Sequence, residues 1–424
     1  MRKVLLFSVL LIVGLVGSQF LPGLAGSSYA ALTQVLKLLT MAALAFIMIH
    51  VGQEFEIDRS RLRSYGWDYV VAATAAAFPW IFCAVYFVLV LAPPAGWSSW
   101  DAWRDALLAG RFAAPTSAGV LFSMLAAAGL ATTWVFRKTR ILAIFDDLDT
   151  VLLMIPLKMM IVGWAWQLGV VIIVMAVQLA IAWRYLHRWR IPATWPWVLG
   201  YAGGLALVCE IIYLVSKLVD DVVPVHIEVL LPAFVLGCIM ARPADGGHGS
   251  GHAAHAASAA EARASTVISS VFMVLVGLSM PPLTGMGGTP EEVAAADVAV
   301  AQAYVVAEGG GAAVSPGADG PSWGWIVIHV LVVTVLANLG KMFPAFCYRR
   351  EVGWRQRLAV AVAMFPRGEV GAGVLIISLS YGIGGPMITV AMLSLALNLL
   401  LTGVFIAVVQ RLIVAEGAQG QEPG

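Results

Sequence analysis

Residues 141–163 read ILAIFDDLDTVLLMIPLKMMIVG, an apolar stretch of bilayer-spanning length that nevertheless carries Asp146, Asp147, Asp149 and Lys158. An aspartate or lysine at the middle of a bilayer costs roughly 2.5 to 3.5 kcal/mol on insertion scales, so adjacent aspartates there indicate a function. Neighbouring side chains on a helix point about 100° apart, so Asp146 and Asp147 cannot serve one partner equally. One can pair with a cation of the protein while the other faces a water-filled path, which suits a membrane carrier of small cations and protons.

The composition of the whole chain is that of a membrane protein. Charged residues make up 12% of the 424 residues, about half their share in soluble domains, and the mean hydropathy is +0.90. At roughly 20 residues per span, the apolar stretches account for about a dozen helices. The net charge of +1 gives no sign of a nucleic-acid partner. Scattered cysteines form no disulfide framework or CxxC metal pattern and are expected to be buried structural thiols: Cys83, Cys209, Cys238 and Cys347.

Twelve spans with both termini in the cytoplasm are expected, because basic residues collect in the loops that this topology places inside. Lys and Arg follow the second, fourth, sixth and tenth spans, and Arg2 and Lys3 open the chain. The first stretch is either a retained span or a cleaved secretory signal, and the topology closes only if it stays. The predicted spans cover approximately residues 4–16, 35–51, 67–91, 105–130, 141–163, 168–182, 195–214, 225–240, 266–280, 323–346, 358–381 and 386–412.

A change in composition divides the chain into two membrane halves, residues 1–242 and 266–414. Residues 243–265 between them are rich in Gly, Ala, Ser and His and are expected to form a flexible cytoplasmic linker. Its histidines could instead bind a metal or sense pH; they are His248, His252 and His255. The acidic, Gly- and Pro-rich insertion 281–322 is expected to lie outside the membrane and to be poorly ordered, and residues 415–424 are a C-terminal tail.

Two spans are poor helices at their centres. The fourth contains Pro115 and Gly119, and the eleventh contains Pro366 among several glycines. Proline removes a backbone donor and clashes with the preceding turn, so both spans should be interrupted near the middle of the membrane. Because they enter from opposite sides, one in each half, they predict inverted repeats with the site between two crossing, interrupted helices. Two unrelated proline kinks are the alternative.

Lys341 in the tenth span supplies the cation that the aspartate helix lacks. Lys341 and Asp146 each lie about five residues from the inner end of a span, so their depths match to within about one turn. A structural ion pair that never opens is the alternative to a pair that works in transport.

The other charged residues within the predicted spans are given a structural role or no role. Arg367 and Glu369 are expected to satisfy each other or a broken helix end. Lys158 is expected to extend its side chain to the membrane surface. Neither Arg111 nor Glu210 is given a role.

These residues resemble the monovalent cation:proton antiporter superfamily, in its bacterial branch with paired aspartates. The resemblance runs from about residue 43 to residue 406 and departs from the family where Asp149 replaces the glycine expected after the aspartates. Six motifs carry it in order: ALAFIMIHVGQEFEID (43–58), PTSAG (115–119), FDD (145–147), VFMVLVGL (271–278), GK (340–341) and PRGEV (366–370).

The resemblance implies a secondary transporter, not an enzyme, that exchanges Na⁺ or Li⁺ for protons by alternating access and is electrogenic. Asp147 and Asp146, with Thr116 and Ser117, would bind the ion and the proton, and Lys341 would form the salt bridge and carry a proton. Residues supporting the crossing helices would be Arg367, Glu369, Pro115 and Pro366. We expect no cofactor, no metal beyond the transported ion, and a homodimer in the bacterial inner membrane. A K⁺/H⁺ antiporter, a sodium-coupled symporter of the same fold and a non-transporting membrane sensor are the alternatives.

Overall fold

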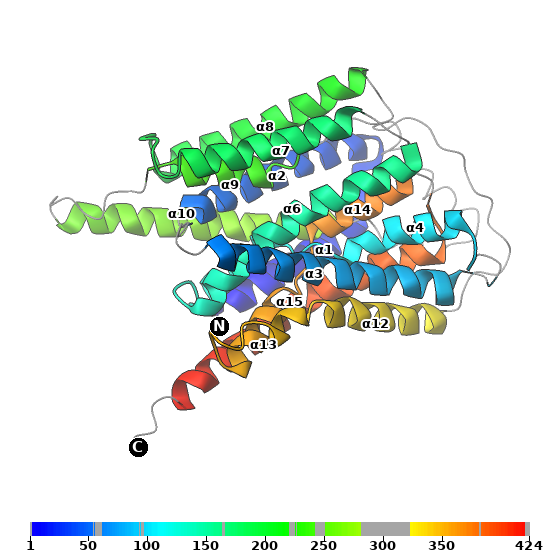
Figure 1. The fold of residues 1–424 in the computed structure, drawn as a ribbon. Helices are drawn as coiled ribbons and strands as arrows, with labels where there is room; N and C mark the ends of the chain where they lie inside the picture. The colour runs from blue at the N-terminus through cyan, green and yellow to red at the C-terminus, as the bar shows by residue number, and fades with distance from the viewer. Residues whose placement is uncertain are drawn as a thin grey trace. The chain divides into compact units, whose positions relative to one another are not determined.

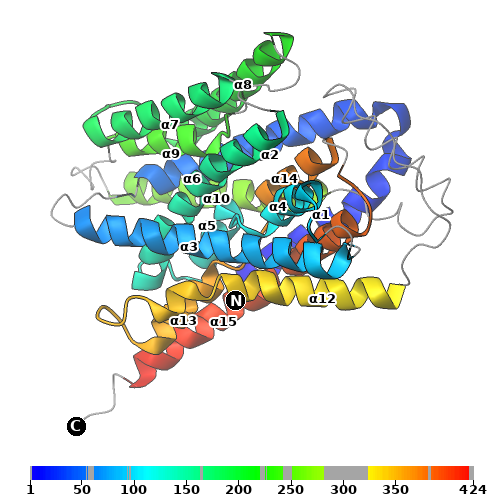
Figure 2. The same cartoon turned by 45° about the vertical axis from the view of Figure 1, so that its right-hand side comes forward.

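The chain folds into helices, shown in Figure 1 and from a second side in Figure 2. The computed structural model describes residues 2–53, 55, 62–92, 94, 97–162, 166–219, 225, 227–241, 251–280, 323–380 and 383–419. Within these residues no strand forms, and one isolated bridge joins Trp189 to Met240. The elements are α1 Arg2–Ala25, η1 Gly26–Ser28, α2 Tyr29–Gln53, α3 Leu62–Tyr86, η3 Phe87–Leu91, α4 Trp100–Gly110, η5 Arg111–Ala113, α5 Ala118–Ala127, α6 Trp134–Val162, α7 Trp166–Arg184, α8 Trp195–Val219, α9 Leu230–Ile239, α10 Gly251–Leu278, α12 Trp323–Gly340, η6 Phe343–Phe346, α13 Trp354–Ala363, α14 Glu369–Ser380 and α15 Pro386–Gln419.

Eight of the described helices are long and apolar enough to cross a membrane. They are α1, α2, α3 with η3, α7, α8, α10, α12 with η6, and α15. The charged helix α6, the short helix α9 and two interrupted helices, α4–η5–α5 and α13–α14, take the places of the remaining predicted spans. The prediction of an all-α polytopic membrane protein is therefore confirmed.

Helix α6 begins at Trp134, well before the predicted start at residue 141. The sequence predicts a basic loop at residues 137–140, but the structure places these residues in the first turns of α6. Lys and Arg are good helix formers, and Lys138 also has tertiary partners: its Nζ lies 3.1 Å from Asp68 of α3 and 3.3 Å from Glu351. Because hydropathy does not reveal such pairs, it predicts the helix start too late.

Helix α10 begins at Gly251, inside the predicted flexible linker. Residues 251–265 are therefore helical, because this part of the linker is rich in alanine, the strongest helix former. His248 and the insertion 281–322 lie outside the described residues. At the other end of the chain, α15 extends to Gln419, into the predicted tail. The division into two sequence halves stays a prediction.

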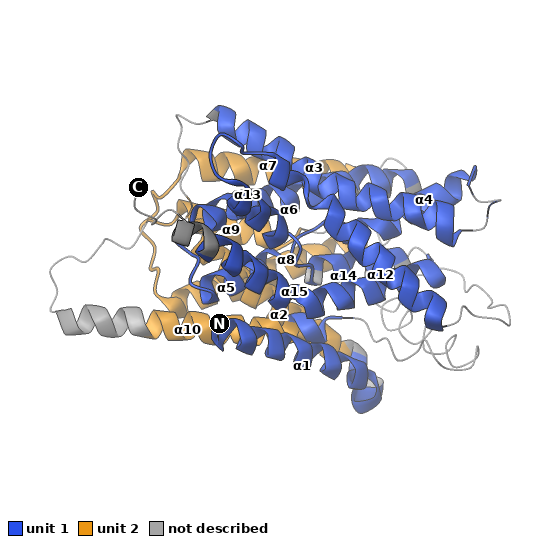
Figure 3. Cartoon of the chain, turned by 90° about the horizontal axis from the view of Figure 1, so that it is seen from below, with its two compact units in different colours: residues 1–30, 61–161, 276–424 blue, residues 31–60, 162–275 orange. Residues whose placement is uncertain are grey.

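Two compact units make up the structure, and Figure 3 colours them separately. Unit 1 comprises residues 1–30, 61–161 and 276–424, and unit 2 comprises residues 31–60 and 162–275. In unit 1 the long helix α15 packs against α1, α12 and α13, and α12 also packs against α3. In unit 2, α9 packs against α7 and α8. All candidate site residues of the sequence analysis belong to unit 1.

In unit 2, helices α2 and α9 approach so closely that both contact positions are glycines. A Cβ atom on Gly52 would overlap the carbonyl oxygen of Phe234, and one on Gly237 would overlap that of Ile49. Small residues of this kind let helix backbones meet in membrane proteins.

Glu210 of α8, which the sequence leaves without a role, pairs with Lys37 of α2 at 3.0 Å in the same unit. Four cysteines are buried, and none of them forms a disulfide: Cys83, Cys209, Cys238 and Cys347.

In unit 1, the C-terminal end of α12 lies directly against α3 at Gly340. A Cβ atom at Gly340 would overlap the backbone nitrogen of Pro79, so only glycine fits this crossing. Because Lys341 is the next residue, the close approach also fixes the position from which its side chain extends.

We predict that Gly340→Ala lowers the thermal stability of the protein in detergent, by roughly 1 to 3 kcal/mol, because the added methyl group forces α12 and α3 apart. Gly324→Ala is the matched control in the same helix, since a Cβ atom there meets no other atom. That control should unfold at the wild-type temperature or slightly above it, because alanine favours the helix. Equal melting temperatures for both variants would contradict the tight crossing.

Candidate ion-binding site

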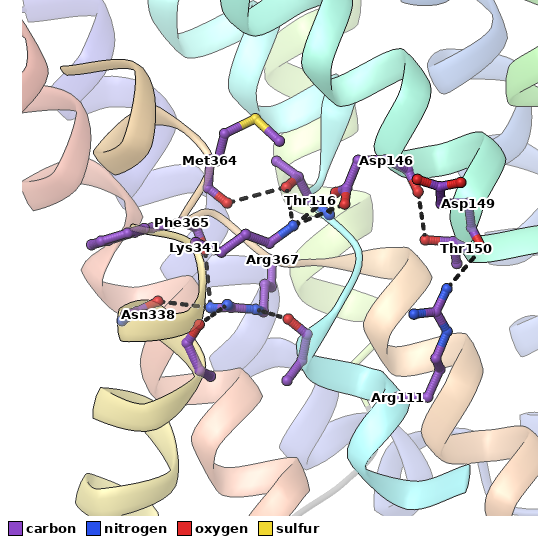
Figure 4. Close-up of polar contacts among 12 residues, drawn as sticks. Arg111, Thr116, Asp146, Asp149, Thr150, Asn338, Lys341, Met364, Phe365 and Arg367 are labelled. Carbon is purple, nitrogen blue, oxygen red and sulfur yellow. Dashed lines mark hydrogen bonds and ion pairs between the residues drawn. The ribbon is translucent and has the colours of Figure 1, made fainter. Parts of the chain in front are cut away.

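Both predicted helix interruptions are present, and they meet (Figure 4). The first separates η5 from α5 at residues 114–117, and the second separates α13 from α14 at residues 364–368. The Ser117 backbone N–H donates to the Pro366 carbonyl at 2.9 Å, and the Thr116 hydroxyl donates to the Met364 carbonyl at 3.1 Å. Each extended segment thus satisfies polar groups that the other leaves without helical partners.

The ion pair predicted between Lys341 and Asp146 forms at this crossing. The ammonium nitrogen of Lys341 lies 3.0 and 2.9 Å from the two carboxylate oxygens of Asp146, and both residues are 0% exposed. Lys341 also donates to the Thr116 hydroxyl at 3.0 Å. The Thr116 backbone N–H donates to Asp146 at 2.8 Å. One residue of the first interruption therefore binds both members of the ion pair.

Asp147 is the second carboxylate of the predicted site and lies one residue further along α6. It is rotated by about 100° from Asp146 and is 7% exposed, whereas Asp146 is fully buried. Thr116 and Ser117 are buried in the interruption that packs against Asp146. The two aspartates therefore have different surroundings, as expected from adjacent positions on a helix.

Arg367 satisfies a broken helix end, one of the two arrangements expected from the sequence. Its guanidinium donates to the carbonyl of Ala113 at 2.8 Å, that of Phe365 at 3.2 Å and that of Ala337 at 2.8 Å, and to the Asn338 side chain at 2.7 Å. Arg367 is only 1% exposed. Its hydrogen bonds hold the first interruption, the second interruption and α12 together.

The remaining predicted support residues lie at the same crossing. Pro115 lies in the first interruption and is buried, and the carbonyl of Pro366 accepts the hydrogen bond from Ser117. Glu369 is the first residue of α14, and its side chain is outside the described part of the structure, as is that of Lys158.

Charges at the crossing match the polarity of the helix ends. Helix C-termini carry partial negative charge on unpaired carbonyls, and N-termini carry partial positive charge on unpaired N–H groups. The cation Arg367 binds the carbonyl of Ala113, at the end of η5. The anion Asp146 binds the N–H of Thr116, just before α5 begins at Ala118. These contacts stabilise an interruption that would otherwise bury unsatisfied backbone groups.

Two residues for which the sequence analysis proposes no role, Arg111 and Asp149, lie beside the ion pair. Arg111 is 0% exposed and donates to the main-chain carbonyl of Asp149 at 3.0 Å. The Asp149 carboxylate accepts a hydrogen bond from the Tyr69 hydroxyl at 2.8 Å. Asp149 follows Asp146 by three residues, and this helical spacing is the sequence signal that places both on one face of α6.

The model of the transmembrane sodium/hydrogen exchanger family matches residues 3–412 of the chain. The chain belongs to this exchanger family. The fold of this exchanger is similar to the structure of the sodium proton antiporter MjNhaP1 from Methanocaldococcus jannaschii at pH 8, with a TM-score of 0.54 and 15% identity. The similarity covers 95% of this chain and 92% of that one. No curated protein sequence matches the chain. The expected membership of the monovalent cation:proton antiporter superfamily is confirmed, and it supports cation:proton antiport across a membrane.

We predict that Lys341→Ala destabilises this exchanger by roughly 3 to 5 kcal/mol, because the buried carboxylate of Asp146 loses its counter-charge. Asp146→Asn combined with Lys341→Gln should recover part of that loss in thermal unfolding measured in detergent. Lys37→Ala, which breaks the more exposed pair with Glu210, should cost less than about 1 kcal/mol and is the control. Strictly additive losses for the Asp146 and Lys341 variants would show that the two residues are not energetic partners.

Proposed function

We propose that the protein exchanges Na⁺ or Li⁺ for protons at Asp147, by alternating access and with net movement of charge. The observation that carries the proposal is the Lys341–Asp146 ion pair at the crossing of two interrupted helices, with a second buried carboxylate on the next residue. Membership of the exchanger family supports the reaction class.

The chemistry of the surrounding groups suits a small hard cation. Na⁺ and Li⁺ prefer oxygen ligands, and a carboxylate on Asp147 is the only ionised oxygen donor that the proposal requires. Hydroxyl groups of Thr116 and Ser117, and carbonyl oxygens freed by the helix interruptions, would complete the shell. Interrupted helices of transporters supply backbone oxygens to ions in this way.

Competition between ion and proton for Asp147 is sufficient for exchange. A protonated Asp147 has no charge with which to hold Na⁺, and a bound Na⁺ excludes the proton. Suppose that the site can turn from one side of the membrane to the other only when it holds Na⁺ or a proton. Each turn in one direction then carries Na⁺, and each turn in the other direction carries H⁺. By analogy with the family, Asp146 pairs with Lys341 when the ion is absent and releases it when the ion binds.

Electrogenic exchange follows if Lys341 carries a second proton. Two protons entering for one Na⁺ leaving move one net charge, worth about 2.3 kcal/mol per 100 mV of membrane potential.

We place the protein in a bacterial cell membrane with both termini in the cytoplasm, because basic residues follow the second, fourth, sixth and tenth spans.

We predict that purified protein in vesicles exchanges protons for Na⁺ or Li⁺, and that Asp147→Asn abolishes this exchange because an amide cannot bind a proton competitively. The measurement is the fluorescence of an internal pH dye after addition of Na⁺, Li⁺ or K⁺ in turn. Asp101→Asn, at an exposed position of α4, is the control and should retain wild-type exchange. Wild-type rates in Asp147→Asn would remove this residue from the site, and exchange with K⁺ alone would change the assigned substrate.

We further predict that an inside-negative potential accelerates H⁺ uptake coupled to Na⁺ exit, and that valinomycin with balanced K⁺ removes the acceleration. Lys341→Gln should keep some exchange but lose its dependence on potential, because Asp147 would still trade one ion for one proton. Robust wild-type flux that ignores the potential would show that Lys341 is structural. A non-transporting sensor would show no flux under any condition.

A further inference from the structure

Arg111 of η5 and Asp149 of α6 form a second polar cluster beside the ion pair (Figure 4). Asp149 is 3% exposed and Arg111 is 0% exposed. The guanidinium group of Arg111 stacks over the ring of Trp80, with 5.0 Å between the guanidinium carbon and the ring centre. The Nη2 group of Arg111 donates a hydrogen bond to the main-chain carbonyl of Asp149 at 3.0 Å. The proposed exchange at Asp147 uses neither residue.

Polar atoms of this cluster remain unsatisfied although they are buried. Among the described residues, no hydrogen-bond partner reaches Nε or Nη1 of Arg111 or Oδ2 of Asp149. Leaving a buried polar atom unsatisfied typically costs about 1 to 3 kcal/mol, and more when the group is charged. Three such atoms on two neighbouring residues therefore need an explanation, because a purely structural ion pair would join them.

Two groups lie on either side of the Asp149 side chain and backbone, the Tyr69 hydroxyl and the Arg111 guanidinium. In this structure its Oδ1 accepts a hydrogen bond from Tyr69, which is 39% exposed and so connects the buried acid to the edge of the packed unit. Arg111 already lies against the backbone of Asp149. For the carboxylate to leave Tyr69 and meet the unsatisfied N–H groups of Arg111, the Asp149 side chain must change its rotamer.

Neighbouring charges couple Asp149 to the proposed transport site. The titratable and charged groups that face it are Asp146 on α6, Tyr69 on α3, Arg111 on η5 and Lys341 after α12. Asp146 lies one helical turn away on the same face. Ionising Asp149 therefore places a second negative charge near Asp146, and protonating Asp149 removes it. The opening of the Asp146–Lys341 pair and the proton on Asp149 must influence one another.

We infer that Asp149 is an additional proton-binding residue of the exchanger, which takes up one proton in its Tyr69-bound position and loses that proton in its Arg111-bound position. In the first step the carboxylate and one proton from water, passed through the Tyr69 hydroxyl, give a neutral carboxyl group. In the second step the proton returns to water and the carboxylate pairs with Arg111. This inference rests on the proposed cation:proton exchange, with Asp147 as the site of ion binding.

The test measures the apparent KM for Na⁺ in vesicles as a function of pH. Where one proton competes with Na⁺, the apparent KM for Na⁺ rises tenfold for each unit by which the pH falls. Asp149→Asn removes one such proton. The rise of the KM on the acid side of the profile should therefore be smaller by up to tenfold per pH unit. Tyr69→Phe keeps the Asp149 carboxyl group but removes its hydrogen-bond donor. The proton concentration at the midpoint of the KM profile should then change by about tenfold, and the slope of the profile should stay the same.

Asp68→Asn is the matched control, because it removes another buried aspartate of unit 1, one that pairs with Lys138 at the start of α6. It should lower the melting temperature and leave the pH profile unchanged. A wild-type pH profile in both Asp149→Asn and Tyr69→Phe, with normal exchange, would overturn this inference and leave the proposed function standing. Absence of exchange in the wild-type protein would instead overturn the proposed function, and this inference with it.

Discussion

A fully buried ammonium group requires a counter-charge, and the structure around Lys341 meets this requirement with Asp146. The pair depends on three local features of the sequence. Gly340 lets α12 lie against Pro79, which sets the position of Lys341. The interruption at Thr116 directs a hydroxyl towards Lys341 and an N–H towards Asp146. Removing any one of these would leave charge in a low-dielectric interior without its full set of partners.

The two interrupted helices stabilise one another because their free backbone groups are complementary. An isolated break in a membrane helix exposes carbonyl and N–H groups that lipid cannot satisfy. Here Ser117 donates to Pro366, and Arg367 binds carbonyls from both breaks. The crossing therefore needs a permanent cation at one side and an anion at the other. In the proposed function, the same polar groups that hold the backbone open would also serve the transported ion.

Much of this arrangement could be predicted from sequence, because length, hydropathy and proline position act locally. The twelve apolar segments and both interruptions follow from them, and the Lys341–Asp146 pair follows from matching depths in two spans. The early start of α6 could not be predicted, since Lys138 is held there by Asp68, a residue far away in the sequence. Nor could the cluster of Arg111, Asp149 and Tyr69, because only the tertiary fold decides which buried charge meets which partner.

The balance of buried charges gives a physical reason for exchange rather than simple conduction. Among the side chains that the structure describes, three buried cations and three buried carboxylates lie at the crossing: Arg111, Lys341, Arg367, Asp146, Asp147 and Asp149. When all six are ionised, their sum is zero. A Na⁺ ion that enters adds one uncompensated charge to a medium where such charge is costly. Release of the Lys341 proton, which the proposed two-proton exchange adds to the proton of Asp147, restores the balance. In the proposed function, coupling between ion and proton would then arise from electrostatics within the site, and the interrupted helices bring the six groups within range of one another.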